Sequence, residues 1–404
     1  MILHRNLVFA VVDTLHLIFN EERYADKEIS LTLKRDKRWG ARDRNFIAET
    51  TYEIVRWKRL YTSIAEVKAP FSREELFKVF AVWATLKGIK LPEWPQFENT
   101  PTRRIKGKFD TLSKERVYRE SIPNWLDELG VKELGEKKWE KEIEAQNQQA
   151  DVILRVNTLK ITVPQLKKAL EQEAIYTKTS KKYPSALILE KRANVFQTQA
   201  FKKGYFEVQD ASSQLVAPFL EIEPGMRIVD TCAGAGGKTL HLAALSENKG
   251  QIIALDIYAG KLRELKRRAK RAGAHNVETR HIDSTKVIKK LHNSADRVLI
   301  DAPCSGLGVL KRNPDSKWKL TEEFVENIKK TQAEILELYS KILRKDGLLV
   351  YATCSVLPSE NFLQIEKFLT TEQGKKFKFI KDQSILASET GFDGFYMALL
   401  KRVE

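Results

Sequence analysis

Residues 228–239 read Ile-Val-Asp-Thr-Cys-Ala-Gly-Ala-Gly-Gly-Lys-Thr, an apolar strand that passes through a glycine-rich turn into a helix. Gly234, Gly236 and Gly237 allow the backbone to pass close to a ligand. The first amides of the helix then offer hydrogen bonds to a carboxylate or a phosphate. A strand, turn and helix of this kind open many nucleotide-binding α/β folds, so the stretch predicts both a fold and a cofactor site.

Two acidic residues extend this candidate site. Asp256 lies twenty residues after Gly236, at the end of the second expected strand, where a carboxylate can bind ribose hydroxyls. Asp283 ends the third expected strand, where an adenine edge can sit. A P-loop is excluded, because it needs glycine where Cys232 stands. A dinucleotide and S-adenosyl-methionine both stay open, beside the simpler alternative of a tight turn that binds nothing.

The chain after residue 224 alternates apolar strands with helices. Strands are expected at 227–230, 251–256, 277–282, 297–301, 348–352, 377–380 and 395–400, and helices at 238–245, 260–272, 322–343 and 360–369. Alternation of this kind produces a mostly parallel sheet with helices on both faces. The predicted fold class of residues 221–404 is therefore α/β, a doubly wound Rossmann-like domain.

Two smaller domains are expected before it. Residues 1–115 predict a helical domain and its linker, because apolar residues recur at helical spacing in three runs. The runs are 7–18, 46–60 and 74–86. Residues 33–44 are rich in arginine and lysine and predict a basic loop that is either solvated or in contact with phosphates. The prolines and cations of 92–108 predict a linker. Residues 116–220 predict a small α/β module.

Composition limits the compartment and the partners. The 404 residues carry a formal net charge of +16, which favours a nucleic-acid partner over a protein that is basic by chance. No apolar run is long enough to span a membrane, and the N-terminal pattern predicts an amphipathic helix instead of a signal peptide. Three distant cysteines and six scattered histidines predict neither a disulfide framework nor a metal site. We expect a cytoplasmic monomer that binds RNA and no membrane.

Two of the three cysteines lie in similar tripeptides after expected strands, in Asp301-Ala-Pro-Cys-Ser and in Thr353-Cys-Ser. A nucleophilic thiolate, a second thiol, an acid and an adenosine cofactor together match methylation at carbon 5 of a pyrimidine. Addition of a thiolate to carbon 6 activates carbon 5, and Asp301 can stabilise the adduct through hydrogen bonds to the base. The simpler alternative is that Cys304 and Cys354 are small buried residues. These residues do not tell which thiol attacks.

Several longer motifs resemble a known family. They are Arg155-Val-Asn-Thr-Leu, Asp230-Thr-Cys-Ala-Gly-Ala-Gly-Gly-Lys-Thr, Asp301-Ala-Pro-Cys-Ser-Gly-Leu-Gly, Arg312-Asn-Pro-Asp and Tyr351-Ala-Thr-Cys-Ser-Val-Leu-Pro-Ser-Glu-Asn. In these motifs the chain is similar to the RsmB/Sun (Nop-type) RNA cytosine-5 methyltransferases, and residues 1–90 resemble the NusB-like RNA-binding domain of the RsmB branch. The resemblance implies a class I methyltransferase fold, S-adenosyl-methionine as cofactor, and 5-methylcytosine formed above all in small-subunit ribosomal RNA.

The resemblance also implies residue roles. Cys354 is the nucleophile, Cys304 assists release of the product, and Asp301 serves both cofactor and base. The implied cofactor contacts are Cys232, Ala233, Gly234, Ala235, Gly236, Gly237, Lys238, Asp256, Asp283 and Asp301. The chain departs from the family at Ala235, where proline would restrain the turn, and at Lys261, where arginine is common. Alternatives are transfer RNA as substrate, a non-catalytic ribosome-assembly factor, and a nicotinamide-dependent oxidoreductase.

Overall fold

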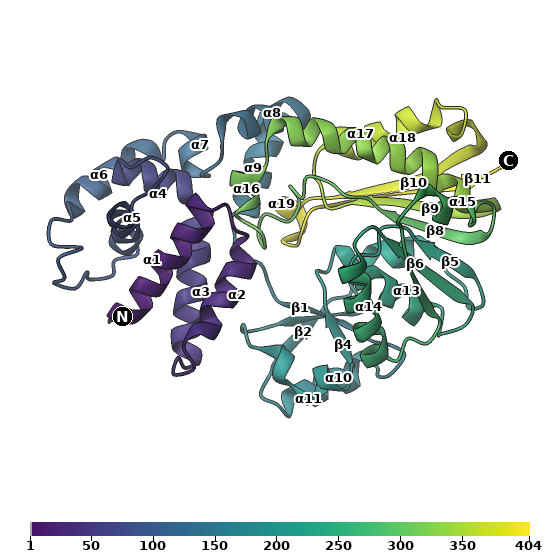
Figure 1. Ribbon diagram of the computed structural model, residues 1–404, viewed down its shortest axis with the longest axis horizontal. Helices are drawn as coiled ribbons and strands as arrows, with labels where there is room; N and C mark the ends of the chain where they lie inside the picture. The colour runs from purple at the N-terminus through teal and green to yellow at the C-terminus, as the bar shows by residue number, and fades with distance from the viewer. Residues whose placement is uncertain (1) are drawn as a thin grey trace. The chain divides into compact units, whose positions relative to one another are not determined.

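A computed structural model describes residues 2–404, which form two compact units (Figure 1). The helical unit comprises Met1–Gln148 with Leu310–Glu322, and the α/β unit comprises Gln149–Val309 with Glu323–Glu404. Residues 116–148 thus pack with the N-terminal helices, and the domain limits predicted at 115 and 220 stay a prediction. Among the described residues, no helix has both the length and the apolar content to cross a membrane.

The helical unit is built from helices, most of which contribute to one apolar core. They are α1 (Arg5–Asn20), α2 (Ala25–Arg35), α3 (Ala41–Arg56), α4 (Lys58–Ala65), α5 (Arg73–Leu86), α6 (Thr102–Leu112), α7 (Arg116–Arg119), α8 (Asn124–Leu134), α9 (Glu136–Gln146) and α16 (Ser316–Lys319). The expected basic loop at 33–44 is only a short turn between α2 and α3. The expected linker at 92–108 contains α6, because Ile105 is buried in the core and fixes that helix to the fold.

The α/β unit begins with a small antiparallel sheet in the order β2-β3-β1-β4. Its strands are β1 (Ile153–Val156), β2 (Thr177–Thr179), β3 (Ala186–Leu189) and β4 (Phe206–Val208), with helices α10 (Val163–Glu171) and α11 (Gln199–Lys202). The short strands and helices confirm a small α/β fold. All three pairings in this sheet are antiparallel, and β3 lies between β1 and β2.

The large sheet has seven strands in the order β10-β11-β9-β8-β5-β6-β7. They are β5 (Arg227–Asp230), β6 (Gln251–Asp256), β7 (Val277–His281), β8 (Ala295–Asp301), β9 (Leu343–Thr353), β10 (Phe377–Ile385) and β11 (Phe395–Arg402). Pairings among β5 to β9 are parallel, and β10 and β11 add an antiparallel edge. The predicted doubly wound α/β class is confirmed.

Apolar side chains alternate between the two faces of this sheet, as the two-residue period of a strand requires. Ile228 belongs to the apolar cluster that includes residues of α12 (Val216–Phe219), α13 (Gly237–Leu245) and α14 (Ala259–Ala272). Val229 belongs to the cluster that includes residues of α15 (Thr285–Lys289), α17 (Glu322–Tyr339) and α18 (Phe362–Leu369). The strand order reverses between β5 and β8. Ligands bind at the carboxyl ends of strands at such a reversal, so the fold itself places a site there.

Candidate active site

The ends of β8 and β9 bring two cysteines together. Asp301 pairs with Ala352 in the parallel register, and the loops that follow place the Sγ atoms of Cys304 and Cys354 3.3 Å apart. Both are free thiols. The neighbouring Cys354 side chain, together with burial, raises the pKa of Cys304 well above its usual value. The distance between the two sulfur atoms permits an S–H···S hydrogen bond within the pair.

A buried carboxylate joins the two thiol loops. Glu360 has no exposed surface, and its Oε1 accepts hydrogen bonds from the hydroxyls of Ser305 and Ser355, each at 2.5 Å. Its Oε2 accepts from the Ser305 N–H at 2.8 Å and from Gln332 Nε2 at 2.9 Å. Each serine directly follows one of the two cysteines. Glu360 therefore fixes the distance between the thiols without touching them.

Gly308 ties the Cys304 loop to the backbone of Cys354. Its N–H donates to the Cys354 carbonyl at 2.9 Å, and its own carbonyl accepts from the Gly394 N–H at 2.7 Å. A Cβ at residue 308 would lie 2.2 Å from the Gly394 oxygen and 2.8 Å from the Cys354 oxygen. Any side chain at this position would therefore displace the backbone that carries Cys354.

Lys238 links the glycine-rich turn to the thiol pair. Its Nζ donates to Asp301 Oδ2 at 2.7 Å and lies 5.1 Å from the centre of the Phe395 ring. Burial lowers the pKa of Lys238, but the Asp301 carboxylate, with a smaller contribution from Cys354, raises it by more, and the net direction is upward. Lys238 is thus a permanent cation whose charge favours the thiolate form of a nearby cysteine.

The glycine-rich turn leaves open space beside its backbone. Gly234 and Gly236 have φ values of 56° and 89°, in the left-handed region that favours glycine. A Cβ at Gly234 or Gly237 would meet no atom within 4 Å. Asp256 accepts from the Gly234 N–H at 2.8 Å and from the Tyr258 N–H at 2.7 Å, and each carboxylate oxygen can accept a second bond. The space and these acceptors fit an adenosine-containing cofactor.

Asp283 and Cys232, two further predicted cofactor contacts, lie in different environments. Asp283 is exposed after β7, two strands from β5, and accepts a hydrogen bond from the Ser284 hydroxyl at 3.0 Å. Burial holds the pKa of the Cys232 thiol above its usual value, so this third cysteine stays neutral. The structure thus brings Lys238 and Asp301 to the two thiols, and it places Asp283 at a distance along the sheet edge.

Comparison with known families accounts for most of the chain. The family model described as 16S rRNA methyltransferase RsmB/F matches residues 217–401, and the RsmF/B-like ferredoxin-like domain matches residues 122–196. Ribosomal RNA small subunit methyltransferase B of Proteus mirabilis is 33% identical over 318 residues, which cover 78% of this chain and 74% of that protein. The chain belongs to the RsmB/F family.

Solved structures agree with the fold of this RsmB/F-family protein. PH0851 has a TM-score of 0.84 and 25% sequence identity, and the match covers all of both chains. NSun6 from Pyrococcus horikoshii, solved with the S-adenosyl-methionine analogue SFG, has a TM-score of 0.65 at 24% identity and covers 71% of this chain and all of that one. RsmB/F proteins are S-adenosyl-methionine-dependent rRNA methyltransferases, which confirms the cofactor prediction and leaves the nicotinamide alternative without support.

Residues of the small sheet and of α14 hold the turn of the RsmB/F-family protein in place. Arg155 of β1 donates to the Gly237 carbonyl at 2.5 Å. Arg268 donates to the Ala235 carbonyl at 2.8 Å and is itself held by Glu207 of β4 at 2.9 Å. These contacts restrain the turn at Ala235, the position where the resemblance predicts proline. Sequence reasoning missed these roles, although Arg155 and Glu360 both lie inside motifs that carried the family resemblance.

The Glu360→Gln variant tests whether this carboxylate positions the thiols. The amide nitrogen of glutamine cannot accept hydrogen bonds, so about half of the four donors lose their partner, at roughly 1–3 kcal/mol of unfolding free energy for each. We expect lower stability in urea titration, and a kcat that falls at least about tenfold while the KM for S-adenosyl-methionine changes little. Glu366→Gln, at an exposed position of the following helix α18, should be neutral in both measurements. Equal behaviour of the two variants would contradict the role of Glu360.

Proposed function

We propose that this protein forms 5-methylcytosine in small-subunit ribosomal RNA through a covalent bond between Cys354 and carbon 6 of the target cytosine. The observation that carries the proposal is the pair of thiols 3.3 Å apart, with the partly buried ammonium–carboxylate pair of Lys238 and Asp301 at the same sheet edge. Two thiols at one centre match a reaction in which a nucleophile must first attach to a ring and then be expelled. The target base must leave its stack to reach them.

The chain's residues account for each proton in this reaction. Cys354, as thiolate, forms a bond to carbon 6 and so makes carbon 5 nucleophilic. S-adenosyl-methionine, when bound, supplies the methyl group that carbon 5 takes. Cys354 is then bonded to the base, and Cys304 transfers its proton to water, which leaves the Cys304 thiolate as the base for the next step. The Cys304 thiolate accepts the proton of carbon 5, and the electrons of that C–H bond expel Cys354. One proton is released for each methyl group transferred.

The same proposal assigns roles around the thiols. Residues 232–238 and Asp256 would hold the cofactor, with Asp283 at the adenine end of the site. Asp301 would bind the base or the cofactor through the carboxylate oxygen that Lys238 leaves available. The helical unit and the small sheet would supply contacts to RNA phosphates, which the formal net charge of +16 favours.

The direct test is nucleoside analysis of 16S rRNA incubated with the protein and labelled S-adenosyl-methionine. Label in 5-methylcytidine supports the proposal, and label in any other nucleoside contradicts it. Transfer RNA serves as the competing substrate, and preferential labelling of transfer RNA would move the proposal to that class. Absence of methyl transfer to either RNA, with intact cofactor binding, would favour a non-catalytic assembly factor.

The Asp301→Asn variant tests the link between cofactor and thiols. Lys238 would lose its anionic partner at a site where it is only 12% exposed, and such a loss is costly because the cation stays largely buried. We expect at least about a tenfold loss in affinity for S-adenosyl-methionine by calorimetry, and a lower rate of methyl transfer at saturating cofactor. Asp346→Asn, which removes a carboxylate exposed on the surface, is the matched control. Unchanged affinity and rate in Asp301→Asn would contradict the assignment.

A further inference from the structure

Helix α6 presents a basic surface that the methyl-transfer reaction does not use. Four of its eleven residues are cations and one is an acid. The cations are Arg103, Arg104, Lys106 and Lys108, of which Arg104 and Lys108 form ion pairs with Glu66. Because Ile105 anchors the helix in the core of the helical unit, these charges are held on a folded surface and not on a flexible linker. A fixed basic surface can place phosphates at defined positions.

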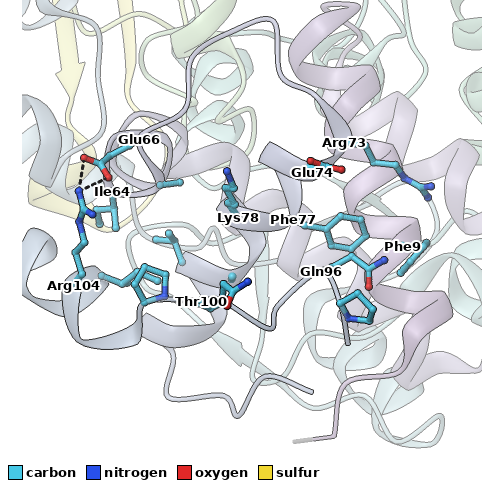
Figure 2. Close-up of a pocket in the computed structure, with 17 residues that line it drawn as sticks. Phe9, Ile64, Glu66, Arg73, Glu74, Phe77, Lys78, Gln96, Thr100 and Arg104 are labelled. Carbon is cyan, nitrogen blue, oxygen red and sulfur yellow. Dashed lines mark hydrogen bonds and ion pairs between the residues drawn. The ribbon is translucent and has the colours of Figure 1, made fainter. Parts of the chain in front are cut away.

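Next to α6 lies a cavity of about 720 Å³ within the helical unit (Figure 2). Its walls come from α4, α5, the start of α6 and the segment 95–101. Phe77 of α5 contributes an apolar wall, and Arg104 and Glu66 form an ion pair at one end (Figure 2). A volume of this size is in the range of pockets that enclose a ligand as large as a nucleotide, roughly 300–1,000 Å³.

Two polar groups of this cavity have unmet bonding capacity. Gln96 Oε1 is buried, and no donor among residues 2–404 bonds to it. An unpartnered buried acceptor is costly, so a ligand that brings an N–H group is favoured there. Lys78 is exposed on α5 and forms no ion pair within the described chain. An unpartnered acceptor and an exposed cation without an ion pair, in one cavity, match a ligand that carries both N–H groups and a negative charge.

A third feature favours an aromatic ligand. The Arg73 guanidinium lies 4.9 Å from the centre of the Phe9 ring, and its side chain is still 53% exposed. Both residues line the same end of the cavity (Figure 2). A guanidinium that is supported on one side by a ring offers its other face for stacking, which is a common way in which proteins bind unpaired bases.

We propose that this cavity binds one unpaired nucleotide of the RNA substrate. The base would lie inside, with an N–H of its edge bonded to Gln96 Oε1, and its phosphate would contact Lys78. The neighbouring phosphates would follow the cations of α6. The inference rests on the proposed function for its rRNA substrate, but it concerns binding and not chemistry, and it can be tested without methyl transfer.

The test is binding of the full-length protein to a 16S rRNA transcript, measured without cofactor over a range of salt concentrations. Gln96→Leu removes the acceptor and should weaken binding about two- to tenfold. Lys78→Glu should weaken binding and reduce the salt dependence by about one phosphate contact. Lys90→Glu makes the same charge change at an exposed lysine outside the cavity, and it should have a smaller effect. Thermal unfolding verifies that all three variants are folded.

Photo-crosslinking locates the nucleotide. A transcript with 4-thiouridine should crosslink to peptides of α5 or 95–101 in the wild type, and Gln96→Leu and Lys78→Glu should reduce that crosslink. The proposal is overturned if both variants bind like Lys90→Glu, or if the wild-type protein does not bind the transcript. It is also overturned if adenosine monophosphate binds by calorimetry while RNA binding is unaffected by either substitution. If RNA binding changes as expected but no methyl group is transferred, nucleotide binding in the cavity is supported and the proposed reaction is contradicted.

Discussion

The Cys354→Ala variant is expected to lose methyl transfer to 16S rRNA by roughly 10⁴-fold or more, because the group that activates carbon 5 is removed. Nothing else about the cofactor site should change, since the Cys354 side chain is not part of the glycine-rich turn. The measurement is the initial rate of transfer of labelled methyl groups, with both substrates at saturating concentrations.

The affinity of Cys354→Ala for S-adenosyl-methionine provides its control. It should match that of the wild type by calorimetry, which separates loss of the nucleophile from loss of folding. Cys354→Ser should also be inactive, because a hydroxyl is a far weaker nucleophile than a thiolate at neutral pH. A rate near that of the wild type in Cys354→Ala would refute the assignment of the nucleophile.

The Cys304→Ala substitution is expected to block a later step of the reaction, so its experimental result should differ from that of Cys354→Ala. Cys354 can still attach to carbon 6, but the group that accepts the carbon 5 proton is missing, so the bond to the RNA is not broken. We expect a protein–RNA adduct that survives a denaturing gel, together with a turnover rate at least about a hundredfold lower.

The double variant Cys304→Ala with Cys354→Ala is the matched control for the adduct. It keeps the first change and lacks the attacking thiol, so no adduct should form. Normal turnover of the single variant without an adduct would contradict the release role of Cys304. An adduct that persists in the double variant would place the covalent bond on another residue.

Local patterns predicted the elements of this chain but not how they meet. The strand and helix periods located β5 to β8 and the helices α13, α14, α17 and α18 within a few residues, because these periods depend only on neighbours in the sequence. They missed the short helix α15 and the first five residues of β9. The same reasoning was wrong for 102–108, where cations suggested a linker and α6 is found, whereas 92–101 form turns as expected. Ile105 is the reason that α6 is part of the fold, because its buried side chain fixes the helix against a core formed by helices distant in the sequence.

The features of the candidate site also fall into those that the sequence predicted and those that required the structure. The amino-acid sequence alone was enough to predict the α/β class of residues 221–404, the glycine-rich turn and the positions of two cysteines after strands. Each of these features depends on residues that are contiguous in the chain. Only the tertiary structure decided the 3.3 Å between the thiols, the Glu360 contacts that hold their loops, and the contact of Arg155 with the turn. These contacts join residues about fifty to eighty positions apart, and they depend on strand order and burial, which no local period encodes.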